Sequence, residues 1–366
     1  MIEGAVPREI REGPAAIRET VDAQADARSI ATRWMVAGIR RIHVIGNGTS
    51  YHSSLAAAAL YRHLAGPDDP VVIPVTAAEF MTYMPELGPR DAIVGISSSG
   101  EFKDVVAVAE AVRGRVPMAG IVHVPDSTLT RVVPEVMYSF GGPSAVPVMT
   151  KTFSATLVAT ELLLIEMLGP GRATKEGRRI LAAADAAEAA IAAAEPLVEG
   201  IAATLVDARH LFVTGGGLGY PAALEAALKL KEMALVHAEG AEVWEMTSGA
   251  ATMLGPDAVV IALAPNGPAR EPIADLLRHA VDWGARTIEV GPEPLVASSV
   301  LLPLPADASE DHAPLHAVPP VALLAFALAR LRGHNPDRPD WIERYHSQGL
   351  RHILGTGVAT GEEAVR

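Results

Sequence analysis

Short apolar runs rich in β-branched residues alternate along this chain with segments in which apolar residues recur three and four positions apart. The runs predict strands near residues 42–46, 71–75, 92–97, 118–123, 135–139, 210–214, 258–264, 286–290 and 299–304. Because these runs are continuously apolar, we expect strands that are buried on both faces of parallel sheets. The alternation of strands and helices predicts an α/β fold with helical crossovers.

Helical spacing is clearest at residues 55–64, 103–113 and 151–168. The N-terminal segment also has a helical pattern. Residues 175–206 are rich in Ala and Glu and hold one proline, which predicts connecting helices in place of a flexible linker.

Two parts of the chain echo each other. The stretch HVIGNGTSY, which ends at Tyr51, is echoed by FVTGGGLGY, which ends at Tyr220. Internal similarity at this distance predicts two copies of one domain. We expect a helical segment at 1–37, a first domain at 38–172, connecting helices at 173–206, a second domain at 207–335 and a tail at 336–366.

Charge and composition narrow the possible functions. The net charge of −13 and the lack of a Lys/Arg stripe argue against a nucleic-acid-binding protein. The chain has no cysteine, which excludes disulfides, thiolate catalysis and cysteine-based zinc sites. The N-terminus lacks the apolar core of a secretory signal, and the longest apolar stretches, 162–168 and 321–331, are too short to span a bilayer. We therefore expect a cytoplasmic protein with no membrane or nucleic-acid partner.

The first candidate site is a run of hydroxyl groups between a predicted strand and a predicted helix, at Ser97, Ser98, Ser99 and Gly100. Free backbone N–H groups and the positive end of the helix dipole favour an anion there, and a phosphate fits. The alternative is a serine that only caps the helix. Three consecutive serines at the carboxyl end of a strand favour binding.

A second strand-to-helix turn contains Gly48, Thr49 and Ser50. Tyr51 stands where the third glycine of a dinucleotide-binding fingerprint would be, so a Rossmann cofactor site is not expected. The two hydroxyl groups extend the same expected crevice. The alternative is that the glycines serve only to form a tight turn.

The predicted helix at 223–232 carries Glu225, Lys229 and Glu232 at spacings of four and three. These spacings place the three charges on one helix face. A solvated ion-pair face is the usual meaning of such a pattern, and spacing alone does not distinguish it from a catalytic group.

A family resemblance lies in four segments of the chain: GNGTSYH, ISSSGE, TKTF and LEAALKLKE. The last segment is followed by HAE. In these segments, which occur in the family's order, the chain resembles the SIS (sugar isomerase) family, which includes the isomerase half of glucosamine-6-phosphate synthase. The resemblance covers about residues 40–345. It implies two tandem three-layer αβα domains, each with a parallel sheet of flavodoxin-like type. It also implies that a phosphorylated sugar or amino sugar binds between them, with no metal or organic cofactor, and that the protein forms a homodimer.

The resemblance assigns roles to residues. The three serines with Thr49 and Ser50 hold the phosphate, and Thr150 with Lys151 lies in a family motif of the sugar site. Glu232 matches the general base that moves a proton between C1 and C2, and Lys229 matches a lysine beside that base.

The chain also departs from the family pattern. Ser248 stands where the synthase has a ring-opening histidine, and Phe102 replaces a threonine of the phosphate loop. Arg344 matches a lysine of the C-terminal tail that enters the site, but arginine does not form an imine. His346 is a candidate replacement for the missing histidine, although a tail histidine is usually solvated. His52 and His237 are expected to serve packing or helix hydrogen bonds.

These residues favour a phosphosugar isomerase of amino-sugar metabolism, which isomerises a hexose or hexosamine 6-phosphate, with amination, deamination or deglycation as further possibilities. Glutamine hydrolysis is not expected, because a cysteine nucleophile is missing. The alternative is a regulatory SIS protein that binds a sugar phosphate without catalysis.

Overall fold

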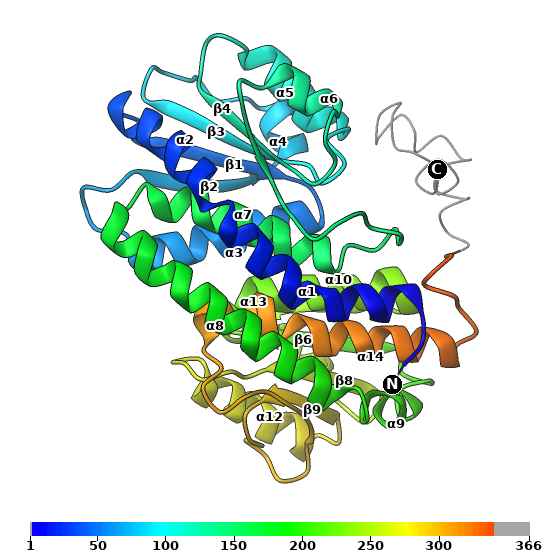
Figure 1. Cartoon of the computed structure of the whole chain (residues 1–366). Helices are drawn as coiled ribbons and strands as arrows, with labels where there is room; N and C mark the ends of the chain where they lie inside the picture. The colour runs from blue at the N-terminus through cyan, green and yellow to red at the C-terminus, as the bar shows by residue number, and fades with distance from the viewer. Residues whose placement is uncertain (1, 340–366) are drawn as a thin grey trace. The chain divides into compact units, whose positions relative to one another are not determined.

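The computed structural model describes residues 2–339, and Figure 1 shows its helices and strands. Two compact units divide the described chain. We call Ala15–Leu181 the first domain, and residues 2–14 together with Ala182–Pro339 the second domain. Helices α1 (Ala5–Asp22) and α8 (Pro170–Ala194) each contribute residues to both units.

The first domain is built on a five-stranded parallel sheet. Its strands are β1 (Arg41–Gly46), β2 (Val71–Thr76), β3 (Asp91–Ile96), β4 (Met118–Val122) and β5 (Glu135–Tyr138). The strand order is β2-β1-β3-β4-β5, which is the flavodoxin-like order. Strands β1 and β3 are neighbours, with Ile45 opposite Gly95. The chain leaves these two strands in opposite directions, so a ligand crevice is expected at their carboxyl ends.

Helices cover both faces of this sheet (Figure 1). They are α2 (Gln24–Val36), α3 (Thr49–Leu64), α4 (Ala77–Thr82), α5 (Lys103–Val112), α6 (Thr128–Val132) and α7 (Lys151–Glu166). Helices α2 and α3 pack against α7 in one layer, and α4 and α6 pack against α5 in the other. Every residue of α7 is buried, which explains why its sequence shows almost no polar face.

The second domain contains another five-stranded parallel sheet. Its strands are β6 (His210–Gly215), β7 (Ala238–Glu242), β8 (Ala258–Leu263), β9 (Arg286–Gly291) and β10 (Val300–Pro303). The order β10-β9-β8-β6-β7 repeats the topology of the first sheet, with β6 and β8 at the point where the strand order reverses.

Helical elements also cover both faces of the second sheet. They are α9 (Val198–Ala203), η1 (Gly217–Gly219), α10 (Tyr220–Ala234), α11 (Val243–Thr247), η2 (Ala250–Met253), α12 (Arg270–Asp282), η3 (Glu310–His312), α13 (Ala313–His316) and α14 (Val318–Leu331). Helix α14 packs against α10 and α9 in one layer, and α11 packs against α12 in the other. The chain therefore contains two three-layer αβα domains, as predicted.

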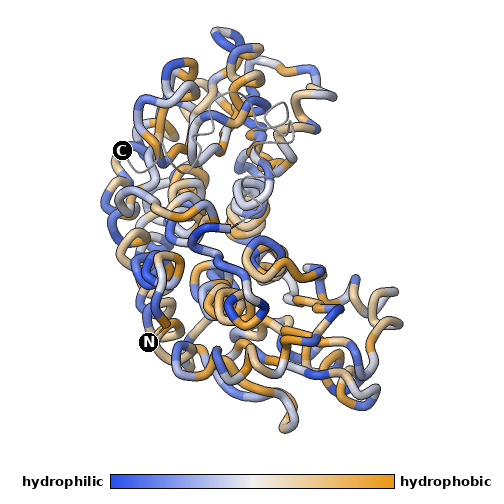
Figure 2. Tube along the Cα trace, turned by 90° about the vertical axis from the view of Figure 1, so that its right-hand side faces the viewer, coloured by the Kyte–Doolittle hydropathy of each residue, from blue (hydrophilic) through white to orange (hydrophobic). Residues whose placement is uncertain are grey.

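One helical run in the described residues, Glu310–Leu331, is long and apolar enough to span a membrane by length and composition. However, 83% of its apolar window is buried inside the protein. It includes α14, whose apolar side chains form part of the core beside α10. Figure 2 shows hydrophilic residues (blue) on many of the outer turns of the chain.

All nine predicted strands are present, and their observed bounds differ from the predicted ones by a few residues at most. Strand β7 was not predicted. Its sequence, AEGAE, has no β-branched or aromatic residue, and it lies at the edge of the sheet beside β6. An edge strand needs less apolar surface than a central strand, so its pattern carries little signal.

Candidate functional site

The serine run lies at the carboxyl end of β3, as predicted, but it does not cap the next helix. Helix α5 begins at Lys103, its N-cap residue is Phe102, and no side chain caps it. Ser97 Oγ and Ser99 Oγ instead accept hydrogen bonds from the N–H groups of Phe102 and Glu101. The serines therefore shape a loop, and a helix-capping role does not explain them.

This loop presents hydrogen-bond donors without partners. Among the described residues, the Ser98 hydroxyl and the N–H groups of Ser98 and Ser99 have no hydrogen-bond partner. The Ser98 carbonyl, by contrast, accepts hydrogen bonds from the N–H groups of His123 and Val124. Because the carbonyl side is occupied and the donor side is open, the loop suits an anion.

Gly100 ends the loop in a conformation that other residues rarely adopt. Its φ is +68°, and a Cβ at this position would collide with Oγ of Ser127. The Ser127 hydroxyl is buried and has no partner among the described residues. Ser127 was missed by the sequence analysis, because only the fold brings this residue to a loop 27 positions earlier.

The second predicted turn follows β1, the strand next to β3 in the sheet. Gly48 has φ +54° and ends the turn after β1, and Thr49 and Ser50 begin α3 with little exposed surface. Asn47 donates a hydrogen bond to Asp104 of α5 over 3.1 Å. The side chain of Asn47 thus links the β1 turn to the helix that follows the serine loop, and we add it to the candidate site.

Thr150 and Lys151 lie where the buried helix α7 begins. Lys151 is 4% exposed, and Oγ1 of Thr150 is buried without a partner among the described residues. Helix α7 follows β5 and packs against α3, so both helices begin after the carboxyl ends of parallel strands. The fold places the two residues after the carboxyl end of β5, at the start of α7.

The corresponding crevice of the second domain has a different chemistry. Gly217, at the matching place of its turn, also has φ +54°, but its N–H donates to a carboxylate oxygen of Glu242. The carboxylate of Glu310 accepts a hydrogen bond from Ala269 in the loop after β8. Carboxylates occupy the donors of this crevice, so an anion is disfavoured there. Among the described residues, only the first domain combines a switch-point crevice with the serine loop.

The charged face of α10 is buried, which excludes the solvated ion-pair interpretation. Lys229 is 1% exposed and Glu225 is completely buried. Lys229 Nζ lies 3.1 Å from Oε1 of Glu225 and 2.6 Å from Oε2 of Glu232. The Glu232 side chain is 27% exposed. Glu232 is thus the one carboxylate of this trio with a face open to a substrate.

The charge state of Lys229 follows from these contacts. Burial by itself lowers the pKa of Lys229, but the negative charges of Glu225 and Glu232 and their hydrogen bonds outweigh it, so the pKa is raised. Lys229 therefore stays a cation at neutral pH. A fixed ammonium beside a partly open carboxylate can balance charge while that carboxylate accepts and returns a proton.

Glu232 and Ser248 lie before and after β7 in the chain. Helix α10 follows β6 and runs back to the start of β7, so Glu232 lies toward the amino edge of the second sheet. Ser248 follows α11, beyond the carboxyl end of β7. Its hydroxyl donates to the carbonyl of Trp244 in its own helix. Arg344 and His346, the other predicted tail residues, lie outside the described residues.

Two further histidines were considered in the sequence, His52 and His237. His52 lies in α3 beside the ring of Tyr51. His237 is exposed and lies in the turn between α10 and β7, so packing does not account for it. Within residues 2–339, no group of three or more His, Cys, Asp or Glu side chains is arranged to hold a metal ion.

A family model described as the SIS domain matches this chain over residues 35–166 and 204–291. These ranges contain both sheet switch points, the serine loop and the Lys229 trio. The match therefore covers the structural features described above and more than half of the chain.

Two curated relatives are glutamine–fructose-6-phosphate aminotransferases of the isomerizing type. The enzyme of Gloeobacter violaceus is 35% identical over 349 residues, and that of Pyrococcus horikoshii is 32% identical over 339 residues. Each match covers 91% of this chain and 56% of the relative. The chain thus spans little more than half the length of these relatives.

Solved structures share the fold at lower sequence identity. The C-terminal domain of the Francisella tularensis glucosamine–fructose-6-phosphate aminotransferase superposes with a TM-score of 0.83 at 22% identity, covering 92% of this chain and 99% of that one. Tagatose-6-phosphate ketose/aldose isomerase from Escherichia coli superposes with a TM-score of 0.76 at 19% identity, covering 91% and 94%.

Proposed function

This chain belongs to the SIS-domain family, and we propose that it is a phosphosugar isomerase in which Glu232 moves a proton between C1 and C2 of a hexose or hexosamine 6-phosphate. The observation that carries the proposal is the burial of Lys229 between Glu225 and Glu232, with only Glu232 partly exposed. A solvated helix face would not bury these charges. Burial of the charges is expected if Glu232 acts as a base beside a fixed counter-charge.

The serine loop supports the choice of a phosphorylated substrate. Open donors at Ser98 and Ser99 lie at the switch point of the first sheet, where αβα folds bind ligands. We propose that Ser97, Ser98, Ser99 and Gly100, with Gly48, Thr49 and Ser50, bind the phosphate. Thr150 and Lys151 are proposed to contact the sugar phosphate from the start of α7.

The proton transfer is the chemistry of an aldose–ketose isomerase. The Glu232 carboxylate takes the proton from C2 of the open-chain aldose, a proton passes from O2 to O1 through the enediol intermediate, and the same carboxylate returns its proton to C1. For an amino sugar the intermediate is an enamine. Lys229 stays protonated and is proposed to hold Glu232 in position. Amination, deamination and deglycation are alternative reactions for the same proposed base.

A regulatory role is the second candidate. The hydroxyl of Ser248 is bonded to its own helix, so it does not offer the acid–base chemistry of the histidine that it replaces. An SIS protein without ring-opening chemistry binds a sugar phosphate as a signal. Cytoplasmic location and a homodimer stay predictions.

The test is proton exchange in D2O. We would incubate the protein with hexose and hexosamine 6-phosphates and follow deuterium incorporation at C1 and C2 by NMR. Exchange that disappears in Glu232→Gln supports the isomerase. Binding of a sugar phosphate without exchange supports the regulatory alternative, and exchange that persists in Glu232→Gln contradicts the assignment of the base.

A further inference from the structure

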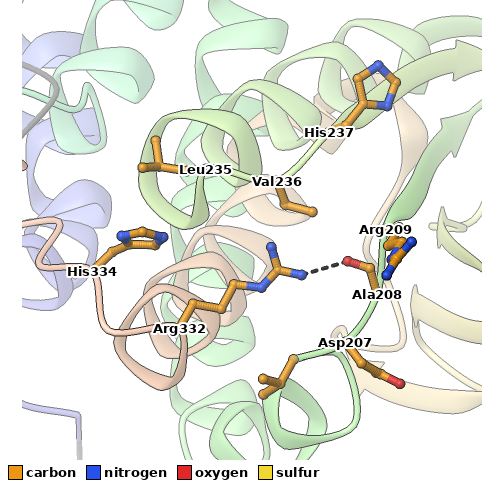
Figure 3. Close-up of a pocket in the computed structure, with 9 residues that line it drawn as sticks. Asp207, Ala208, Arg209, Leu235, Val236, His237, Arg332 and His334 are labelled. Carbon is orange, nitrogen blue, oxygen red and sulfur yellow. Dashed lines mark hydrogen bonds between the residues drawn. The ribbon is translucent and has the colours of Figure 1, made fainter.

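A second candidate site lies within the second domain. A pocket of about 480 Å³ lies between three chain segments, and Figure 3 shows the residues that line it. They are the approach to β6 at 206–209, the turn from α10 to β7 at 235–237, and the end of α14 at 332–334. None of the proposed sugar-site residues lines it. A pocket of this volume accommodates a small metabolite.

The pocket is basic in an acidic protein. Arg209, Arg332, His237 and His334 line it, whereas Asp207 is its one acidic residue. Asp207 is engaged by Arg286, whose Nη1 lies 3.3 Å from its carboxylate. The chain carries a net charge of −13, so a pocket with this excess of cationic side chains departs from the rest of the surface.

The turn after α14 brings Arg332 and His334 to the pocket. Gly333 has φ +79° and ends the helix, with its N–H bonded to the carbonyl of Arg330. The N–H of His334 bonds to the carbonyl of Ala329. After this reversal the guanidinium of Arg332 points toward Ala208, and His334 lies on the side of Leu235, as Figure 3 shows.

Arg332 is the central group of the pocket. Nη2 of Arg332 donates to the carbonyl of Ala208 over 2.6 Å. Nε of Arg332 is buried and has no partner among the described residues, and Nη1 has none either. A guanidinium has five donors, and a buried one without an acceptor is costly. The bond to Ala208 uses one donor and leaves Nε and Nη1 available to a ligand.

The side chains that line the pocket favour a phosphorylated organic molecule as its ligand. A guanidinium fork fits phosphate oxygens in pairs, Arg209 adds a second fixed positive charge, and the two imidazoles add hydrogen-bonding groups. Leu235 and Val206 expose 46% and 41% of their surfaces and give the pocket an apolar rim. The volume exceeds that of a single phosphate ion, which leaves room for an attached organic group.

We propose that this pocket binds the phosphate group of a small phosphorylated metabolite, with Arg332 as its principal ligand and Arg209, His237 and His334 around it. The site is separate from the serine loop and independent of the proposed isomerase activity. Leu235 follows Glu232 by three positions at the end of α10. A ligand in this pocket therefore contacts the turn that ends the helix carrying the proposed base.

The test uses inorganic phosphate and the imidazole signals of the pocket. We would label the twelve histidines and follow their side-chain NMR resonances during a phosphate titration. His237→Gln and His334→Gln assign the two signals. We expect saturable shifts of both signals as phosphate is added, because an anion bound beside the rings changes their surroundings.

Variants distinguish this pocket from the serine loop. Arg332→Ala is expected to weaken phosphate binding at His237 and His334 at least tenfold, and Arg332→Lys to weaken it less. Arg209→Ala gives a second reading if Arg332→Ala does not fold. Ser98→Ala and the surface control Arg278→Ala should leave both signals responsive. Absence of any response in the folded wild type, or an undiminished response in folded Arg332→Ala, overturns the proposal.

Discussion

Lys229 donates a 2.6 Å hydrogen bond to Glu232, yet Lys229 is 1% exposed whereas Glu232 is 27% exposed. One residue of this pair belongs to the core and the other reaches solvent. Glu225, one turn earlier and completely buried, holds Lys229 from the opposite side. This asymmetry separates a structural role for Glu225 from the proposed chemical role of Glu232, and mutations can test it.

Glu232→Gln is expected to reduce C1–C2 proton exchange by about 10²–10⁴-fold, because it removes a general base. The amide keeps the shape of the side chain and a carbonyl that still accepts a bond from Lys229, so thermal unfolding should change little. Exchange measured by NMR in D2O checks the first part and calorimetry checks the second. Glu239→Gln, at an exposed position nine residues before Ser248, is the matched control.

Lys229→Met is expected to destabilise the protein by about 3–5 kcal/mol, because it leaves the buried carboxylate of Glu225 without its cation. Urea unfolding measures this loss. Arg278→Ala breaks an exposed pair with Asp275 and should change the stability far less, because water screens exposed charges. The double variant Lys229→Met with Glu225→Gln should recover part of the lost stability. Equal losses for the buried and exposed pairs would contradict the buried charge trio.

Gly100→Ala is expected to abolish sugar-phosphate binding and lower stability more than Gly114→Ala. Both glycines have positive φ, +68° and +72°, so both variants carry similar backbone strain. At Gly114 no atom lies within 4 Å of the added Cβ, whereas at Gly100 it meets Ser127. Binding and melting temperature of the two variants isolate the steric effect, and equal behaviour would refute the proposed tight loop.

Stability should fall as the pH rises, through Glu161 of α7. Burial and the nearby charge of Glu176 raise the pKa of Glu161 from 4.5 to about 8. Between these values the folded protein holds a proton that the unfolded chain releases, so stability declines by up to about 1.4 kcal/mol per pH unit. Glu161→Gln should remove this slope, with the largest gain in stability near pH 8.

Urea unfolding at pH 5 and pH 8 measures this effect. Glu110→Gln, at an exposed position of α5 in the same domain, serves as the control and should retain the wild-type slope. If Glu161→Gln also retains that slope, Glu161 is ionised in the folded protein and its burial does not control the pH dependence.

The sequence by itself determined the two α/β domains and most of their elements. Buried parallel strands are continuously apolar, so nine of the ten described strands could be predicted from hydrophobicity alone. The serine loop was also predictable, because its three hydroxyl groups adjoin in sequence and the strand before it is clear. Strand β7 could not be predicted, because an edge strand made of Ala, Glu and Gly lacks an apolar pattern.

Only the tertiary structure decided which polar groups are buried and which distant segments meet. Spacing places Glu225, Lys229 and Glu232 on one helix face, but packing of α10 in the second domain determines that this face is inside. Ser127 reaches Gly100, and Arg332 reaches Ala208, through the crossovers of the sheets. Local sequence carries periodicity and turn chemistry, whereas burial and the meeting of remote side chains depend on how whole layers pack.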